Sequence, residues 1–139
     1  MLELTRAVVD DIVAHARAEY PKEACGMVAG AGARGTHVFR MRNVDASPIS
    51  YTMDPAEQLR VMKRMRAERV EMLAIYHSHT ATPAYPSPTD VRLAAYPDVV
   101  YMLVSLKDTT PDVQGYRITD GTITPEPLRI IDAAEAPHG

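Results

Sequence analysis

Several features that would point to particular functions are missing from this chain of 139 residues. It has one cysteine, Cys25, and so cannot form an internal disulfide, which fits the reducing cytoplasm. It has no apolar run near the roughly 20 residues that span a bilayer, and its N-terminus lacks the basic segment of a signal peptide. Its net charge of -3 gives no basic excess for nucleic acid or an anionic membrane. We therefore expect a soluble, cytoplasmic protein that binds neither.

The length suits one domain with a single core, which we assign to residues 1–132, followed by a flexible tail at 133–139. Thr5 can cap a first helix that Pro21 ends. The inward face of this helix is spaced at helical period and consists of Val8, Val9, Ile12, Val13 and Ala16.

Four further segments have the pattern of strands. ACGMVAG (24–30) opens just after Glu23 as a buried strand, and THVFRMRNV (36–44) alternates in the manner of an edge strand. EMLAIYH (71–77) and VVYMLVSL (99–106) are nearly continuous apolar runs, which is typical of strands covered on both faces. We expect the last two to be central in the sheet.

Helix and turn signals complete the pattern. Asp54, Pro55 and Glu57 mark the start of a second helix, and Ser87 opens a third that ends before Pro97. Asp120-Gly121 predicts a hairpin between QGYRIT and TITPEPLRII. Helices and strands interleave, so the predicted class is α/β (α+β): a mixed central sheet flanked by helices in three layers.

His77 and His79 lie at the end of a predicted strand, where residues two apart point to the same side. Both imidazoles can therefore converge on one metal ion, and Asp90 in the first turn of the next helix is the best third ligand. Each residue also has an ordinary interpretation. Two histidines can simply end a strand, and Ser87 with Asp90 is a good helix cap.

The order of these residues resembles the JAMM (MPN-plus) family of zinc metallopeptidases. HSHTATPAYPSPTD reads H-x-H, seven residues, S-x-x-D, and PKEACG supplies the upstream glutamate. The resemblance implies a cytidine-deaminase-like, three-layer domain with one zinc ion per chain on His77, His79 and Asp90. It further implies that Glu23 acts as general base and that Ser87 donates a hydrogen bond to the developing oxyanion.

One departure from the family pattern narrows the resemblance. Most members have proline after the second histidine, whereas this chain has Thr80. HSHTAT and YTMDPAEQL are similar to actinobacterial peptidases that release cysteine from a CysO-type sulfur carrier. This implies a ubiquitin-like partner ending in Gly-Gly with one cysteine attached by an amide, and a role in cysteine biosynthesis.

Other assignments stay open from the sequence. The substrate could instead be another ubiquitin-like protein that an isopeptidase or processing peptidase cleaves, or the chain could be a non-catalytic MPN scaffold. A zinc deaminase would need a Cys-x-x-Cys pair, which this chain lacks. The sequence does not decide between a monomer and a homo-oligomer. We expect Cys25 to be a small buried residue, His15 and His37 to be solvated, and His138 to lie in a loose tail.

Overall fold

The computed structural model describes residues 1–132, which form three helices and eight strands. The predicted tail at 133–139 lies outside the described residues, so the predicted division at residue 132 stays a prediction. In chain order the elements are β1 (Leu2–Thr5), α1 (Arg6–Glu19), β2 (Cys25–Ala31), β3 (Arg34–Met41), α2 (Pro55–Ala67), β4 (Glu71–His79), α3 (Pro88–Leu93), β5 (Val100–Ser105), β6 (Asp112–Thr119), β7 (Thr122–Pro125) and β8 (Leu128–Ile131). No helix among the described residues is long and apolar enough to cross a membrane.

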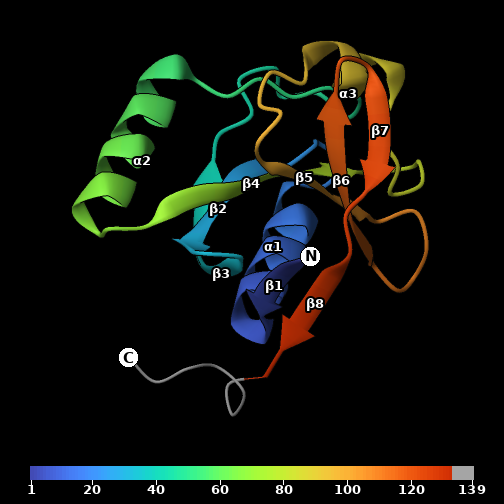
Figure 1. The fold of residues 1–139 in the computed structure, drawn as a ribbon. Coiled ribbons are helices and arrows are strands. Elements are labelled where there is room, and N and C mark those ends of the chain that lie inside the picture. The colour runs from blue at the N-terminus through green and yellow to red at the C-terminus, as the bar shows by residue number, and fades with distance from the viewer. Residues whose placement is uncertain (133–139) are drawn as a thin grey trace.

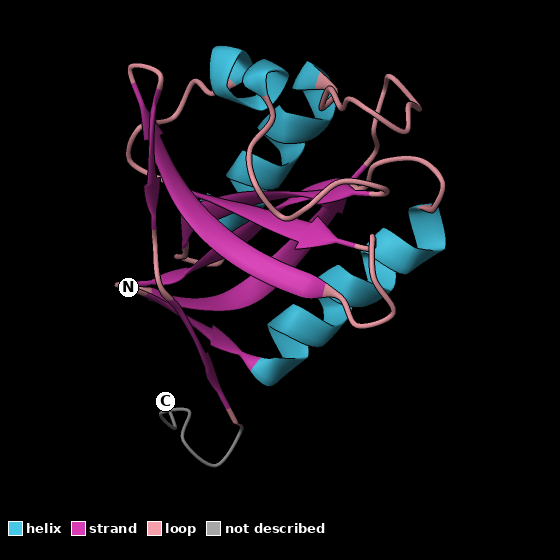
Figure 2. Ribbon diagram, turned by 90° about the vertical axis from the view of Figure 1, so that its right-hand side faces the viewer, coloured by secondary structure: helices cyan, strands magenta, loops and turns pink. Residues whose placement is uncertain are grey.

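All eight strands belong to one mixed sheet in the order β7-β6-β5-β4-β2-β3-β1-β8. The pair β4 and β5 is parallel, as are the pairs that β1 makes with β3 and β8, and the other pairs are antiparallel. The sheet is strongly twisted, with α1 against one face and α2 and α3 against the other (Figures 1 and 2). This confirms the predicted mixed, three-layer α+β class and the central positions of β4 and β5.

The two faces of the sheet carry separate apolar cores. On the α1 side, Val8, Val9, Ile12 and Ala16 pack against buried side chains that include Ala74 and Tyr76 of β4. On the α2 side, Val61 and Met65 pack against a set that includes Ile75 of β4 and Cys25 of β2. Successive residues of β4 thus serve opposite faces, as the alternation of a strand requires.

The predicted helix caps and the predicted hairpin turn are present at the expected residues. Thr5 caps α1 by accepting a hydrogen bond from the amide of Val8, and Asp54 caps α2 in the same way through the amide of Ala56. Asp120 and Gly121 both have positive φ, 50° and 79°, the backbone geometry of a two-residue hairpin turn between β6 and β7.

Two strand predictions are wrong in part. The strand predicted at 36–44 lies instead at Arg34–Met41, and β1, which had no signal of its own in the sequence, pairs with its start at Arg34 and Gly35. Residues 36–41 have only β2 as a strand partner, in keeping with the edge-like pattern. The segment TITPEPLRII splits into β7 and β8, since its two prolines have no N–H for a continuous ladder. Its second half pairs with β1 at the other end of the sheet. Both errors concern four-residue strands from the two ends of the chain, which leave little local signal.

Candidate metal centre

Two imidazoles meet at the carboxyl end of the central strand β4. His77 and His79 are both buried, and their Nε2 atoms lie 3.2 Å apart. β4 holds them in place because it is paired antiparallel with β2 as far as His77 and parallel with β5 as far as His79. The intervening Ser78 faces away, and its Oγ accepts a hydrogen bond from the amide of Ala24 at 2.8 Å. The predicted convergence of the two histidines is therefore present.

The first turn of α3 brings a carboxylate to the same point. Asp90 Oδ2 lies 3.1 Å from His77 Nε2 and 3.0 Å from His79 Nε2. A capping box holds Asp90: its amide donates to Ser87 Oγ at 3.1 Å, and its Oδ2 accepts from the Ser87 amide at 2.9 Å. The helix cap and the metal-ligand interpretations of Ser87-Pro88-Thr89-Asp90 are thus compatible in one geometry.

The electrostatics of this cluster suit a bound cation. Burial lowers the pKa of His77, so its imidazole is neutral and offers a lone pair. Burial alone would raise the pKa of Asp90, but the two histidines, whose Nε2 atoms contact its Oδ2, and the Ser87 amide hold it well below its usual range. The cluster therefore presents two imidazole nitrogens and a charged carboxylate oxygen, the three-ligand donor set of a catalytic zinc site. We conclude that these residues fit a divalent metal ion.

The two ring nitrogens that face away from the cluster have different environments. His79 Nδ1 lies 2.8 Å from the carbonyl oxygen of Pro83 and donates to it, which leaves Nε2 as the lone-pair nitrogen. Although burial alone would lower the pKa of His79, its contacts with Asp90 and Pro83 raise that pKa above its ordinary value.

His77 Nδ1 is buried and has no hydrogen-bond partner among residues 1–132. The ring of Tyr51 stacks on His77 instead, with centroids 4.5 Å apart and planes inclined by 27°. Tyr51 begins the segment YTMDPAEQL that carries part of the resemblance, but nothing in that segment indicated a role for it at the site.

Glu23 lies just before β2, which runs antiparallel to β4 with Cys25 opposite His77. Only 4 % of Glu23 is exposed, and its Oε1 has no partner within the described part of the chain. Burial raises the pKa of this carboxyl to about 7; the charge of His79 partly opposes the rise and that of Asp90 adds to it. A buried carboxyl with an unpaired oxygen is unusual, because burying such a group costs free energy unless it is hydrogen-bonded.

The remaining candidates are sorted by their surroundings. Cys25 is fully buried, as predicted, and burial raises the pKa of its thiol to about 12, which leaves it unreactive at neutral pH. The prediction for His15 is wrong: it is buried, and its Nδ1 lies 2.6 Å from Tyr76 Oη in the core on the α1 side. His37 is partly buried and hydrogen-bonds with the hydroxyl of Thr36 at 2.8 Å. His138 lies outside the described residues.

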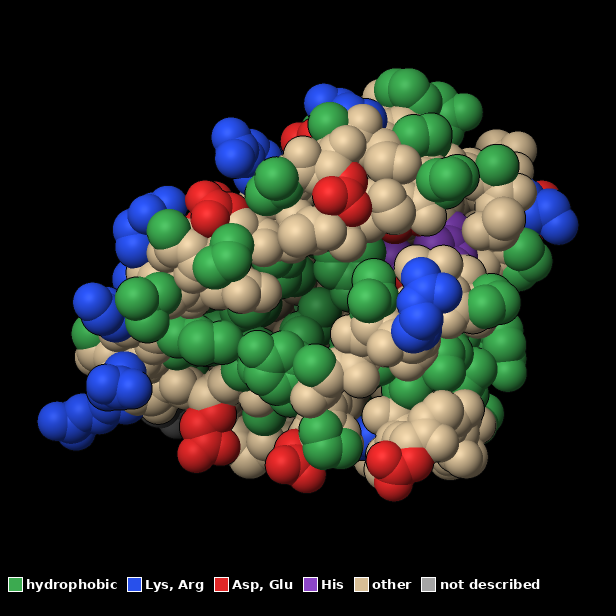
Figure 3. Space-filling model, turned by 90° about the horizontal axis from the view of Figure 1, so that it is seen from above, with side chains coloured by type: hydrophobic (Ala, Val, Ile, Leu, Met, Phe, Trp, Pro, Cys, Tyr) green, Lys and Arg blue, Asp and Glu red, His purple; other side chains and the backbone are tan. Residues whose placement is uncertain are grey.

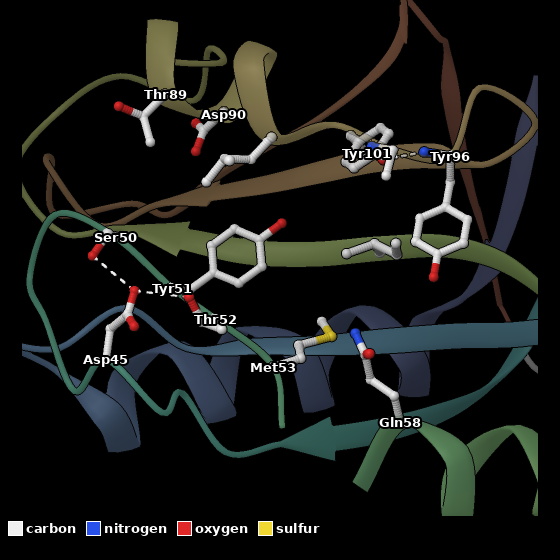
Figure 4. A pocket seen from close by; sticks show the side chains of 13 residues that line it. Asp45, Ser50, Tyr51, Thr52, Met53, Gln58, Thr89, Asp90, Tyr96 and Tyr101 are labelled. Atoms are coloured by element: carbon white, nitrogen blue, oxygen red, sulfur yellow. Dashed lines mark hydrogen bonds between the residues drawn. The ribbon is translucent and has the colours of Figure 1, made fainter. Parts of the chain in front are cut away.

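A cavity of about 400 Å³ opens beside the cluster. Seen from above, the surface is hollowed between apolar side chains, with histidine visible at one side of the hollow (Figure 3). Figure 4 shows Tyr51 in the middle of this cavity, between Asp90 at one end and Tyr96 and Tyr101 at the other. Among the described lining residues there are two acids and no lysine or arginine: Asp45, Ser50, Tyr51, Thr52, Met53, Gln58, Ile75, Thr89, Asp90, Leu93, Ala95, Tyr96 and Tyr101.

The chain is thus an α+β domain with a His-His-Asp cluster that could hold a metal ion at the end of its central strand. Residues 5–119 match the model of the prokaryotic homologues of the JAB domain, and the chain belongs to that family. This confirms the resemblance to JAMM proteins that the motif indicated.

Named relatives and solved structures agree with this assignment. The chain is 43 % identical to the CysO-cysteine peptidase of Mycobacterium tuberculosis over 135 residues, 95 % of this chain and 92 % of that protein. It is 37 % identical to a probable TtuB-protein conjugate cleaving protease of Thermus thermophilus, over 69 % of this chain and 65 % of that one. The solution structure of a protein from Desulfitobacterium hafniense superimposes over all of both chains with a TM-score of 0.88 at 35 % identity. A JAB1/MPN domain protein from Archaeoglobus fulgidus shares the fold, with a TM-score of 0.62 at 14 % identity over 94 % of this chain and 99 % of that one.

Proposed function

We propose that this chain is a zinc-dependent peptidase that hydrolyses the amide bond between a ubiquitin-like sulfur-carrier protein and a C-terminal cysteine, releasing cysteine. The observation that carries the proposal is the convergence of His77, His79 and Asp90 beside a buried, unpaired glutamate. The named relatives make the chain a peptidase, and the CysO-cysteine peptidase supports the narrower substrate because its similarity extends over nearly the whole of both chains. We further propose a cytoplasmic location, because the reducing cytoplasm keeps the thiol of the released cysteine reduced.

In this proposal His77, His79 and Asp90 hold the zinc ion. When bound, zinc acts as a Lewis acid that acidifies water and polarises a carbonyl oxygen. Glu23 is the general base: it accepts a proton from the attacking water and passes it to the nitrogen of the departing cysteine. Burial raises the pKa of Glu23 to about 7 in the metal-free protein, and a zinc ion bound nearby would lower it, which favours the carboxylate form that a general base needs.

Ser87 is the proposed hydrogen-bond donor to the oxygen of the attacked carbonyl. Its Oγ already accepts the amide of Asp90 through a lone pair, which fixes the side chain and leaves its own proton to point at the substrate. Water oxygen adds to the carbonyl carbon, and the carbon–nitrogen bond breaks. The products are the carrier carboxylate and free cysteine, whose amine has gained the proton that Glu23 carried.

We infer that the Gly-Gly tail of the carrier occupies the cavity beside the cluster. β4 is paired with β2 as far as His77 and with β5 as far as His79, so an added strand has no open edge at His77. The cavity is largely apolar and lined by two acids, so it suits a neutral tail better than the carboxylate of the released cysteine. Lys22 and Arg92, the nearest basic residues to the motif in sequence, are exposed and line no part of this cavity.

A second candidate keeps the chemistry and changes the substrate: an isopeptidase that removes a ubiquitin-like protein from other proteins. The similarity to the Thermus protein, named for cleaving protein conjugates, favours it. Such a substrate presents a lysine side chain in place of free cysteine, and the same catalytic residues would serve. A scaffold without catalysis has less support, because the chain carries a complete ligand set.

Mass spectrometry of a carrier–cysteine adduct tests the proposal. We expect incubation with the purified protein to remove the mass of one cysteine residue, a chelator to stop the reaction, and added zinc to restore it. Cleavage that continues after complete metal removal contradicts the zinc mechanism. Cleavage of protein conjugates but not of the cysteine adduct favours the isopeptidase, and a protein that binds no zinc by atomic absorption supports the scaffold.

A further inference from the structure

We propose that Tyr51 is a positioning residue that sets the metal affinity of the cluster by fixing the orientation of the His77 ring. The inference rests on the proposed metal site and adds to it a residue outside the motif. A histidine that binds a metal through one nitrogen usually donates the other N–H to a fixed acceptor, which holds the ring in place. His79 has such an acceptor in the carbonyl of Pro83, and His77 has none among residues 1–132.

The stacked ring of Tyr51 supplies the missing constraint. It lies nearly parallel to the imidazole at a centroid distance of 4.5 Å, within the range of aromatic pairs that attract each other. A ring held flat against His77 prevents rotation about the bond between the imidazole and its Cβ, so Nε2 stays aimed at His79 and Asp90. Without it, the unpaired Nδ1 would favour rotation of the imidazole towards any new acceptor.

The backbone on both sides of Tyr51 is anchored. We call residues 43–53 the site loop. The side chain of Asn43 accepts from the amides of Asp45 and Thr52, both at 3.1 Å, and donates to the carbonyl of Ser50 at 2.9 Å. Asp45 Oδ2 in turn accepts from the hydroxyls of Ser50 and Thr52, at 3.1 and 3.0 Å (Figure 4). The two neighbours of Tyr51, Ser50 and Thr52, are thus both held by side chains from the start of the loop.

The site loop is also tied to the rest of the site. Asn43 Nδ2 donates to the carbonyl of Glu23 at 3.1 Å, and the Glu23 amide donates to the carbonyl of Ser47 at 2.8 Å. The hydroxyl of Thr80, just after the second histidine, donates to the carbonyl of Pro48 at 3.3 Å. One loop therefore contacts the strand that carries the histidines and the residue proposed as general base. The site loop therefore links the proposed general base to the histidines through specific hydrogen bonds as well as through packing.

Metal titration of the metal-free protein tests the proposal without substrate. Zinc affinity is measured by competition with a chromogenic chelator, and cobalt(II) absorption reports the ligand geometry. Because outer ligands typically change metal affinity by about 10–100-fold, we expect Tyr51→Leu to weaken zinc binding by about that factor. Tyr51→Phe keeps the ring and should bind within about twofold of the unmodified protein, since stacking does not need the hydroxyl.

Two further variants separate orientation from general damage. Tyr85→Leu removes a tyrosine of the segment between β4 and α3, one that is 54 % exposed and packs edge-on against Tyr116 rather than on a ligand, and zinc affinity should not change. Asn43→Ala loosens the site loop while leaving Tyr51 intact, and should weaken zinc binding and broaden the cobalt spectrum. It also serves if Tyr51→Leu does not fold.

The outcomes distinguish this inference from the proposed function. If the unmodified protein binds zinc and both Tyr51→Leu and Asn43→Ala bind it equally well with unchanged cobalt spectra, Tyr51 has no positioning role and the metal site stands. If Tyr51→Phe is as weak as Tyr51→Leu, the hydroxyl matters rather than the stacked ring, and the inference is wrong. If the unmodified protein binds no zinc, the proposed function itself fails.

Discussion

Strand β4 contributes to a buried histidine arrangement on each of its faces, and the two differ in how their polar atoms are paired. On the α1 side, Tyr76 of β4 meets His15 of α1, and their polar atoms satisfy each other at 2.6 Å. On the opposite side, one residue further along, His77 meets His79 and Asp90, with His77 Nδ1 left unpaired among the described residues. The first arrangement is closed, while the second gathers lone pairs around one point and opens on a cavity.

The comparison shows that burial of a histidine does not by itself mark a functional site. Burial lowers the pKa of both His15 and His77. What separates them is the number of lone-pair donors that converge, the unpaired carboxyl of Glu23 beside them, and access to substrate. We therefore expect changes on the metal face to abolish activity with little cost in stability, and changes on the α1 face to do the reverse.

Glu23→Gln should show the largest loss of activity without a loss of stability. The amide keeps the size of the side chain but cannot accept the proton of the attacking water, so we expect kcat to fall by about 10²–10⁴-fold. The metal ligands are untouched, so zinc content and the melting temperature should be unchanged. Glu57→Gln is the matched control: Glu57 accepts a hydrogen bond from the amide of Arg42, away from the cluster, and its loss should leave kcat unchanged. Full activity in Glu23→Gln would remove Glu23 from the mechanism.

Ser87→Ala should show the next largest effect, because it should lower both the catalytic rate and the stability. Removing an oxyanion donor typically lowers the rate by about 10²–10³-fold, and removing an N-cap costs about 1 kcal/mol. Thr5→Ala separates the two, because it removes the N-cap hydroxyl of α1 on the other face of the sheet. We expect similar changes in urea unfolding for the two variants but a change in kcat for Ser87→Ala alone. Equal kcat in both would reduce Ser87 to a helix cap.

On the α1 face the expected change is in stability alone. His15→Leu leaves the hydroxyl of the buried Tyr76 without its partner, which typically costs about 1–3 kcal/mol of unfolding free energy. Tyr76→Phe removes the other half of the pair. The double variant should be less destabilised than the sum of the two single ones, because no polar group is then left alone. Denaturant unfolding measures these differences, and any loss of zinc affinity in the same variants would show that the two faces of β4 are coupled.

The same comparison explains what the sequence could predict. The metal ligands follow from local rules: alternation along a strand aims His77 and His79 together, and a helix cap fixes Asp90. The central strands and the three layers follow from apolar runs and helix periodicity. These features depend on residues close in sequence, so their spacing is enough.

The missed features depend on contacts between distant segments. His15 has polar neighbours in α1, and only the packing of that helix on β4 brings Tyr76 against it. Tyr51 precedes His77 by a helix and most of a strand, and the path of the site loop decides that it stacks there. β1 and β8 are four residues long and pair with each other in parallel from opposite ends of the chain, so neither has a signal of its own.

The smallest expected effect is a pH dependence of stability that belongs to the α1 face. Burial lowers the pKa of folded His15, with the charge of Arg40 adding to it and those of Glu19 and Asp11 opposing it. The unfolded chain has an ordinary histidine pKa of about 6.5. Above that value both states are neutral and His15 has no effect on pH dependence. As the pH falls through about 6.5, the unfolded chain binds the proton first, so stability is lost on acidification, by at most about 1.4 kcal/mol per pH unit.

Urea unfolding of metal-free protein at pH 7.5 and 5.5, compared with His15→Gln, isolates this contribution because the residues of the metal face titrate in both proteins. His15→Gln should lose less stability than the unmodified protein over this interval. An equal or larger loss in the variant would mean that the closed arrangement accepts a proton as readily as water does, and the contrast between the two faces would then rest on the metal cluster alone.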